Sequence, residues 1–141
     1  MLARISEMVF VDAVRRYVDA LPEPAHGWLA GLRDRYTSRA LALLHARPAE
    51  AWTIDALGKQ VGLSRSALHE RFVHFVGQPP MQYLAQWRMQ LAAQRLLQSN
   101  ATVAAIAQEA GYESEAAFSR AFKRIVGASP AAWRRERVRA P

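Results

Sequence analysis

Residues 106–134 read IAQEAGYESEAAFSRAFKRIVGASPAAWR. This stretch predicts a helix that ends at a turn around Gly111, a second helix that carries Arg120, and a third helix that starts at Pro130. The apolar residues of the stretch would hold the first two helices at a fixed angle: Ile106, Ala110, Phe118, Phe122 and Val126. The polar face of the second helix stays free, which is typical of a helix-turn-helix whose second helix enters the major groove of DNA.

The same pattern occurs twice along the chain. A shift of 49 residues aligns Ile54 with Val103 and Gly62 with Gly111. After one extra residue in the second copy, a shift of 50 aligns Leu68 with Phe118, Phe72 with Phe122, Gly77 with Gly127, Pro80 with Pro130 and Tyr83 with Trp133. Apolar residues, turns and prolines recur in one order, so the chain contains two copies of one helical unit.

At these residues the chain resembles the DNA-binding domain of the AraC/XylS family of bacterial transcription regulators. In the first unit and the connector, the family pattern is matched by Gly62, Ser64, Leu68, Phe72, Gly77, Pro80, Tyr83, Leu84, Arg88, Ala92, Leu96 and Leu97. In the second unit it is matched by Ile106, Ala107, Gly111, Tyr112, Ser114, Phe118, Arg120, Phe122, Lys123, Gly127, Ser129 and Pro130. The resemblance covers about residues 39–135.

This resemblance implies an all-α fold of about seven helices, in which a long connector helix joins two helix-turn-helix subdomains. It further implies sequence-specific binding of double-stranded DNA, with the two reading helices in successive major grooves. Contact with RNA polymerase, and commonly activation of transcription, are also implied. A reading helix is here the second helix of each helix-turn-helix.

The expected organisation is an N-terminal amphipathic helix and linker over residues 1–36, followed by the DNA-binding domain over residues 37–141. We expect its first unit over residues 37–79, its connector helix over 80–98 and its second unit over 99–135. Thr37 is predicted to cap a helix over residues 38–46. Apolar residues recur every three to four positions over residues 2–21, and this stripe could pack on the DNA-binding domain, associate with a second copy or dock on another domain.

Ten residues are predicted to contact DNA. Since side chains near the start of a reading helix lie closest to the bases, the predicted base contacts in the first helix are Arg65, Ser66, His69 and Glu70. In the second they are Glu115, Ala116, Ser119 and Arg120, and Lys123 and Arg124 suit phosphates.

Three of these side chains keep an alternative. Arg65 could contact a base or a phosphate, and a bidentate contact to guanine is predicted for Arg120, with a phosphate contact as the alternative. Glu70 could accept a hydrogen bond from cytosine or remain a solvated or internally paired carboxylate, and many family members have arginine there. Arg88 is predicted to bind a carboxylate or carbonyl within the protein, with a DNA contact as the alternative. Residues 134–139 are predicted to form a solvated, loosely ordered tail.

The composition favours a polyanionic partner, because the net charge is +7 and the pI is near 10.8. The charge is uneven: residues 114–141 contain seven basic and two acidic residues, whereas residues 49–113 contain five of each. There is no cysteine. We find no signal peptide and no apolar run as long as a membrane span, so a cytoplasmic, nucleoid-associated protein is expected.

No enzymatic or cofactor site is predicted. The histidines of the HERFVH run, His69 and His74, lie about 140° apart around a helix and so cannot chelate one metal. The run from Gly62 to Ser66 misses the last glycine of a nucleophile elbow. We therefore expect no enzyme, metal or cofactor. The alternative function is a nonspecific basic architectural DNA-binding or protein-interaction module.

Overall fold

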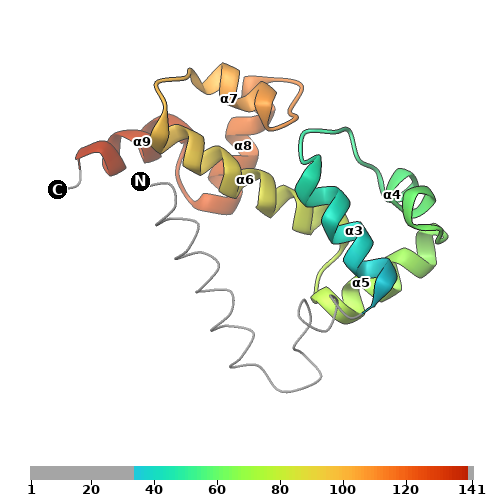
Figure 1. Ribbon diagram of the computed structural model, residues 1–141. Helices are drawn as coiled ribbons and strands as arrows, with labels where there is room; N and C mark the ends of the chain where they lie inside the picture. Colours follow the sequence, from blue (N-terminus) through green and yellow to red (C-terminus); the bar gives the residue numbers. More distant parts are fainter. Residues whose placement is uncertain (1–33, 140–141) are drawn as a thin grey trace. The chain divides into compact units, whose positions relative to one another are not determined.

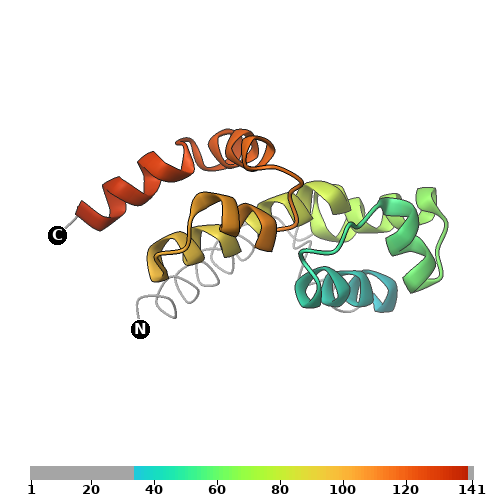
Figure 2. The same ribbon diagram turned by 90° about the horizontal axis from the view of Figure 1, so that it is seen from above.

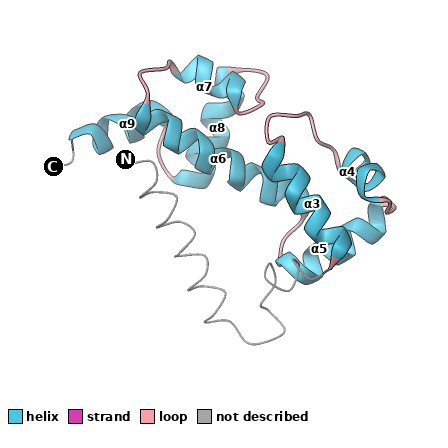
Figure 3. Ribbon diagram, viewed as in Figure 1, coloured by secondary structure: helices cyan, strands magenta, loops and turns pink. Residues whose placement is uncertain are grey.

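The structure is a computed structural model and describes residues 34–139. Within this range all regular elements are helices, with loops between them (Figure 3). They are α3 Arg35–Ala46, α4 Ile54–Val61, α5 Arg65–Val76, α6 Pro80–Gln98, α7 Val103–Glu109, α8 Glu115–Val126 and α9 Pro130–Arg139. The expected all-α class is confirmed, as is the predicted extent of α6. The amphipathic helix predicted for the first twenty residues lies outside the described residues.

The described chain divides into two compact units. Residues 34–47 and 51–84 form the N-terminal unit, and residues 48–50 and 85–139 form the C-terminal unit. The boundary falls inside α6, so this one helix contributes its first turn to one unit and the remainder to the other. Leu84 accordingly joins the N-terminal core, while Met89, Ala92 and Leu96 join the C-terminal core.

In the N-terminal unit, α3 packs against both α4 and α5 (Figure 1). Its core consists of Ala40, Leu41, Leu44, Trp52, Leu57, Val61, Leu68, Phe72 and Leu84. Phe72 is fully buried and meets the edge of the Tyr83 ring at a centroid distance of 5.8 Å. The aromatic pair holds the inner face of α5 against the start of α6.

In the C-terminal unit, α8 packs against α7 and α9 (Figure 2). Its core consists of Met89, Ala92, Leu96, Ile106, Ala107, Phe118, Ala121 and Phe122. Phe122 meets the edge of the Trp133 ring at 5.8 Å, the same distance that separates Phe72 from Tyr83. The repeat read from the sequence is therefore present in the packing of both cores.

The helix caps repeat in the same way. Thr53 and Thr102 accept a hydrogen bond from the backbone N–H three residues later, at 3.0 and 3.1 Å. Ser64 and Ser114 do the same for α5 and α8, at 3.2 and 3.0 Å. Each bond satisfies an N–H that a helix start would otherwise leave unpaired. The short polar side chains thus fix where all four helices begin.

Glycine makes the tight turn in both units. Gly62 and Gly111 have φ of +85° and +87°, a left-handed conformation that strains any residue with a Cβ. The extra residue of the second copy lies after Gly111, where two residues precede Ser114 instead of one. The serine cap after the turn is unchanged, whereas α4 ends at Gly62 as its C-cap and α7 ends one position earlier, at Ala110.

The predicted cap at Thr37 is wrong. Helix α3 begins at Arg35, and the side chain of Asp34 is its N-cap. Asp34 Oδ2 accepts hydrogen bonds from the Thr37 backbone N–H at 2.9 Å and from Thr37 Oγ1 at 2.8 Å. Thr37 is fully buried. A threonine and an aspartate three residues apart are both good caps, and burial of the threonine decides between them.

The loosely ordered tail predicted for residues 134–139 is also wrong, although residues 135–137 are exposed as expected. Residues 130–139 form helix α9, capped by Ser129. Arg134 Nε donates to the Leu96 carbonyl at 2.9 Å, and a terminal nitrogen donates to the Ser99 carbonyl at 3.2 Å. These carbonyls lie at and just after the end of α6 and have no partner within that helix's own ladder. The Arg134 side chain therefore caps the C-terminal end of α6.

Candidate nucleic-acid interface

The candidate interface consists of two helices, α5 and α8, each the second helix of its motif. Both have twelve residues, a serine N-cap and a glycine with positive φ at the C-terminus. Their inner faces are anchored by fully buried aromatic residues, Phe72 in α5 and Phe118 and Phe122 in α8. Because each helix is fixed on one side, its opposite side presents a defined surface.

The predicted contact residues lie on these outer surfaces. Nine are exposed: Arg65, Ser66, His69, Glu70, Glu115, Ala116, Arg120, Lys123 and Arg124. Ser119 is half-buried. The first four belong to α5 in the N-terminal unit and the remaining six to α8 in the C-terminal unit. All ten are therefore accessible to a ligand within their own unit, at least in part.

Four charged side chains on these faces have no partner within the described part of the chain. Among residues 34–139, no hydrogen bond or ion pair engages the side chains of Arg65, Glu70, Glu115 or Arg120. The internally paired carboxylate that we considered for Glu70 is thus not formed in the described part of the chain. Unpaired, exposed charges at the start of a helix-turn-helix reading helix are available for an external ligand.

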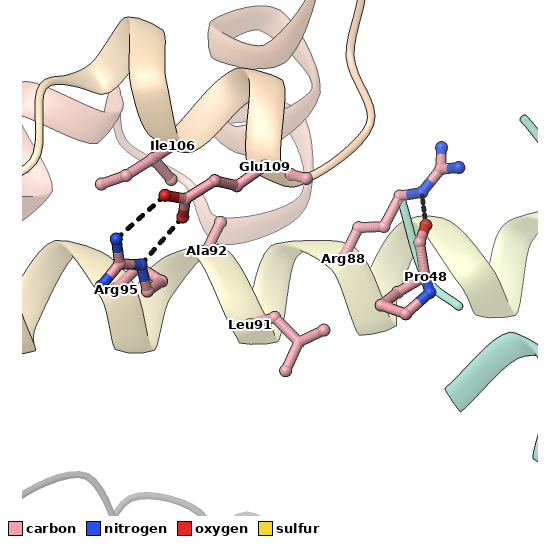
Figure 4. Close-up of a pocket in the computed structure, with 8 residues that line it drawn as sticks. Pro48, Arg88, Leu91, Ala92, Arg95, Ile106 and Glu109 are labelled. Carbon is pink, nitrogen blue, oxygen red and sulfur yellow. Dashed lines mark hydrogen bonds and ion pairs between the residues drawn. The ribbon is translucent and has the colours of Figure 1, made fainter. Parts of the chain in front are cut away.

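Other arginines form ion pairs with carboxylates of their own unit. Arg71, also on α5, forms an ion pair with Asp34 at 2.7 Å. Arg95 binds Glu109 through two hydrogen bonds of 2.8 and 2.9 Å (Figure 4). Arg71 was absent from the predicted contacts, and its pairing with a residue 37 positions earlier gives no periodic signal in the sequence. The structure thus separates the paired arginine of α5 from the unpaired Arg65.

Arg88 has the internal role predicted for it. Its Nε donates to the Pro48 carbonyl at 2.7 Å (Figure 4). A terminal nitrogen donates to the Glu50 carbonyl at 2.8 Å. Its guanidinium also lies over the Tyr112 ring, 5.7 Å from the centroid. Burial lowers the pKa of Arg88, and Tyr112 opposes that shift. Arg88 therefore fixes the segment 48–50 within the C-terminal unit.

A pocket of about 180 Å³ lies beside this contact, lined by α6, α7 and Pro48 (Figure 4). Its floor is apolar, formed by Leu91, Ala92 and Ile106 among others. The charged groups that line it are Arg88, Arg95 and Glu109, and each already has a partner in the unit. The pocket thus presents no unpaired charge for a ligand.

Two further searches concern only the described range. Residues 34–139 contain no group of three or more histidine, cysteine, aspartate or glutamate side chains placed to hold a metal ion. None of the helices between residues 34 and 139 combines the length and the apolar character that crossing a bilayer requires.

The comparisons with known proteins agree with this geometry. The model of a helix-turn-helix domain family matches residues 57–136. A Streptomyces lividans protein described as an AraC-like transcription regulator is 43% identical over 131 residues, which are 93% of this chain and 43% of that protein. The transcriptional regulator AlkR of Acinetobacter baylyi is 38% identical over 132 residues, 94% of this chain and 43% of that protein. The chain thus spans less than half the length of these relatives.

Solved structures agree as well. The DNA-binding domain of AdpA, a global transcriptional factor crystallised with a target DNA, has a TM-score of 0.70 and 30% identity. It matches 74% of this chain and 95% of that domain. An AraC-type DNA-binding protein from Chromobacterium violaceum has a TM-score of 0.70 at 26% identity, covering 79% of this chain and 99% of that one. The chain belongs to the AraC-type helix-turn-helix family, as its resemblance implied.

Proposed function

We propose that this chain is the DNA-binding part of a transcription regulator and that it recognises a specific double-stranded DNA sequence. Helices α5 and α8 would each enter a major groove of one duplex, in successive turns. The observation that carries the proposal is the pair of equally capped reading helices, whose outer faces have exposed charges with no partner among residues 34–139. Membership in the AraC-type family supports it.

The proposed contacts follow from the accessible faces. Arg65, Ser66, His69 and Glu70 of α5 would contact bases, with Glu115, Ala116, Ser119 and Arg120 of α8 as their counterparts. Lys123 and Arg124 lie exposed one turn further along α8, near its C-terminus. They would bind phosphates, because cations at the end of the reading helix lie away from the bases and close to the backbone.

The competing function is nonspecific attachment driven by charge. The excess of basic residues over residues 114–141 favours it, whereas the balanced charge over residues 49–113 does not. Electrostatic binding weakens steeply with salt and carries no sequence preference. The two functions therefore differ in what remains at physiological salt.

The test is selection of binding sites from a pool of random duplexes at about 0.15 M salt. We expect a common motif and a preference of about 10³-fold or more for that motif over random DNA. A chain that enriches no motif, and binds selected and random duplexes equally, would be a nonspecific binder.

Three wider roles, drawn from family membership or from the apolar stripe over residues 2–21, are also proposals. RNA polymerase would be a partner in activation, and the protein would reside with the nucleoid. Residues 1–21 would mediate self-association or docking, and they lie outside the described residues. Transcription in vitro from a promoter that carries the selected site, with and without this chain, would test the first role.

A further inference from the structure

The two reading helices can be compared position by position. Both begin directly after a serine N-cap and end at a glycine after twelve residues. Superposing the caps aligns Arg65 with Glu115 at the first helical position and Glu70 with Arg120 at the sixth. The alignment rests on hydrogen-bonded caps, and the insertion between the two copies precedes Ser114, so it does not disturb the register of the helices.

Charge is reversed at both positions. Helix α5 has a cation at position one and an anion at position six. Helix α8 has an anion at position one and a cation at position six. A separation of five residues places the two charges about 140° apart around a helix, at the two margins of the outward face. Between these margins the exposed side chains of α5 include Ser66 and His69, whereas α8 also has the cation Lys123, which lies about 80° from Glu115 around the helix. The two units thus present opposite charge orders on equivalent scaffolds.

All four charges are available. They are exposed, and none has an ion pair or hydrogen bond among residues 34–139. In contrast, the exposed Arg71 and Arg95 have carboxylate partners within their units. Within the described residues the four reversed charges pair with no other element, so they remain available to a ligand that binds the outward faces.

The chemistry of DNA limits what each charge can contact. An arginine can donate to O6 and N7 of guanine or to a phosphate. A carboxylate only accepts hydrogen bonds and is repelled by phosphates. In the major groove its typical partner is the N4 amino group of cytosine. A glutamate at the margin of a reading helix hence favours a base contact and disfavours a backbone contact.

We propose that the two half-sites of the target DNA differ at two equivalent positions, where one half-site has guanine and the other has cytosine. The N-terminal unit contacts guanine through Arg65 and cytosine through Glu70. The C-terminal unit contacts cytosine through Glu115 and guanine through Arg120. This inference rests on the proposed function, in which α5 and α8 both enter major grooves. Because the half-sites differ, the chain binds its site in one orientation only.

The experiment exchanges the charges of α8. The double variant Glu115→Arg with Arg120→Glu gives α8 the charge order of α5 and leaves the net charge unchanged. Binding sites are selected from the same random duplex pool with the unaltered chain and with the variant. We expect guanine and cytosine to exchange at two positions of one half-site, with the other half-site unchanged. Affinity for the original site should fall roughly 5- to 150-fold for each lost contact and return on the exchanged site.

The control variant is Arg95→Glu with Glu109→Arg. It also exchanges one basic and one acidic residue, but across an exposed ion pair of α6 and α7 outside both reading helices. It should select the original site. The reciprocal variant of α5, Arg65→Glu with Glu70→Arg, should exchange the two bases of the other half-site, so the inference does not depend on one variant folding.

The outcomes separate this inference from the proposed function. If the unaltered chain selects a motif and neither exchange variant alters it at guanine or cytosine positions, the inference is overturned and the proposed function stands. If the unaltered chain selects no motif, the proposed function itself fails. The unaltered chain provides a further check, since a motif with identical bases at equivalent positions of both half-sites would contradict the inference without any variant.

Discussion

At the scale of single residues, arginine has two separate roles in this protein. Arg88 and Arg134 donate to backbone carbonyls, and Arg95 binds a carboxylate, so all three stabilise the fold. Arg65 and Arg120 lie exposed on the reading helices with no ion pair or hydrogen bond among residues 34–139. A guanidinium that is hydrogen-bonded within the fold would have to break those bonds to bind another group. An exposed guanidinium without such bonds can bind an external anion or base directly.

Arg120 and Lys123 should differ in their effect on DNA binding. We expect Arg120→Ala to cost about 1–3 kcal/mol on the selected site and to relax the preference at one base pair. Lys123→Ala should weaken binding to selected and random duplexes by similar amounts, since a phosphate contact is independent of sequence. Fluorescence anisotropy titrations with both kinds of duplex would measure the two effects. A loss of the same size on random DNA for Arg120→Ala would show that Arg120 binds phosphate.

Arg88 and Arg95 should differ in their effect on stability. Arg88→Ala removes two hydrogen bonds to the segment 48–50, and we expect the free energy of unfolding to fall by about 2–3 kcal/mol. Arg95→Ala removes an exposed ion pair and should cost less than about 1 kcal/mol. Urea denaturation followed by circular dichroism would measure both. Equal losses would mean that the Arg88 contacts are no stronger than a surface pair.

His45 should make the stability depend on pH. Its ring stacks on Tyr83, with Nε2 2.6 Å from the Tyr83 hydroxyl, and burial lowers the pKa of His45 below its ordinary value of 6.5. The unfolded chain then binds a proton more readily than the folded one, so this stability is present above pH 6.5 and is lost as pH falls through the lowered pKa. We expect the free energy of unfolding to decrease from pH 7 to about pH 5.

The variant His45→Gln should reduce this dependence on pH, and His74→Gln, at an exposed position of α5, should leave it intact. Urea denaturation at a series of pH values would measure the slope. The same burial raises the pKa of Tyr83 to about 12, so Tyr83 stays protonated over the whole range and the slope belongs to histidine. An unchanged slope in His45→Gln would assign the effect to other groups.

The role of a residue could be predicted where its neighbours in the sequence indicated it, but a partner distant in the sequence could not. The outward positions of α5 and α8 followed from helical periodicity, and the internal role of Arg88 followed from its apolar surroundings. The pairing of Arg71 with Asp34 and of Arg134 with Leu96 joins residues 37 and 38 positions apart. Contacts of that kind depend on tertiary packing, and no local pattern encodes them.

At the scale of helices, the ends are specified by caps and glycines. Helix α6 has the predicted bounds, and α5 and α8 each begin after a serine cap and end at a glycine, because these residues act on their immediate neighbours. The start of α3 was missed because Asp34 and Thr37 are both suitable caps, and only the buried core decides which one lies outside the helix.

Gly111 and Gly127 should tolerate alanine unequally. Both have positive φ, +87° and +101°, so alanine at either position should cost about 1–2 kcal/mol. A Cβ on Gly111 would also lie 2.7 Å from the Ala49 carbonyl oxygen, whereas a Cβ on Gly127 meets nothing within 4 Å. We expect Gly111→Ala to cost at least about 1 kcal/mol more than Gly127→Ala. Thermal unfolding of the two variants would test this, and equal melting temperatures would mean that the segment 48–50 moves aside freely.

At the scale of the whole molecule, the distribution of charge matters more than its sum. The net charge of +7 is concentrated in residues 114–141, which contain seven basic and two acidic residues, and α8 contributes Arg120, Lys123 and Arg124 to it. Specific binding requires both the base contacts and the phosphate anchors, and the anchors alone set the dependence on salt.

The slope of log affinity against log salt should locate these anchors. We expect the double variant Lys123→Ala with Arg124→Ala to make the slope on random duplex DNA shallower by about 2, because two phosphate contacts are lost. The matched variant Arg39→Ala with Lys59→Ala removes the same charge from exposed positions of α3 and α4 and should leave the slope nearly unchanged. Anisotropy titrations from about 0.05 to 0.3 M salt would give both slopes. If the two variants shift the slope equally, DNA responds to net charge as a whole and α8 is not the anchoring helix.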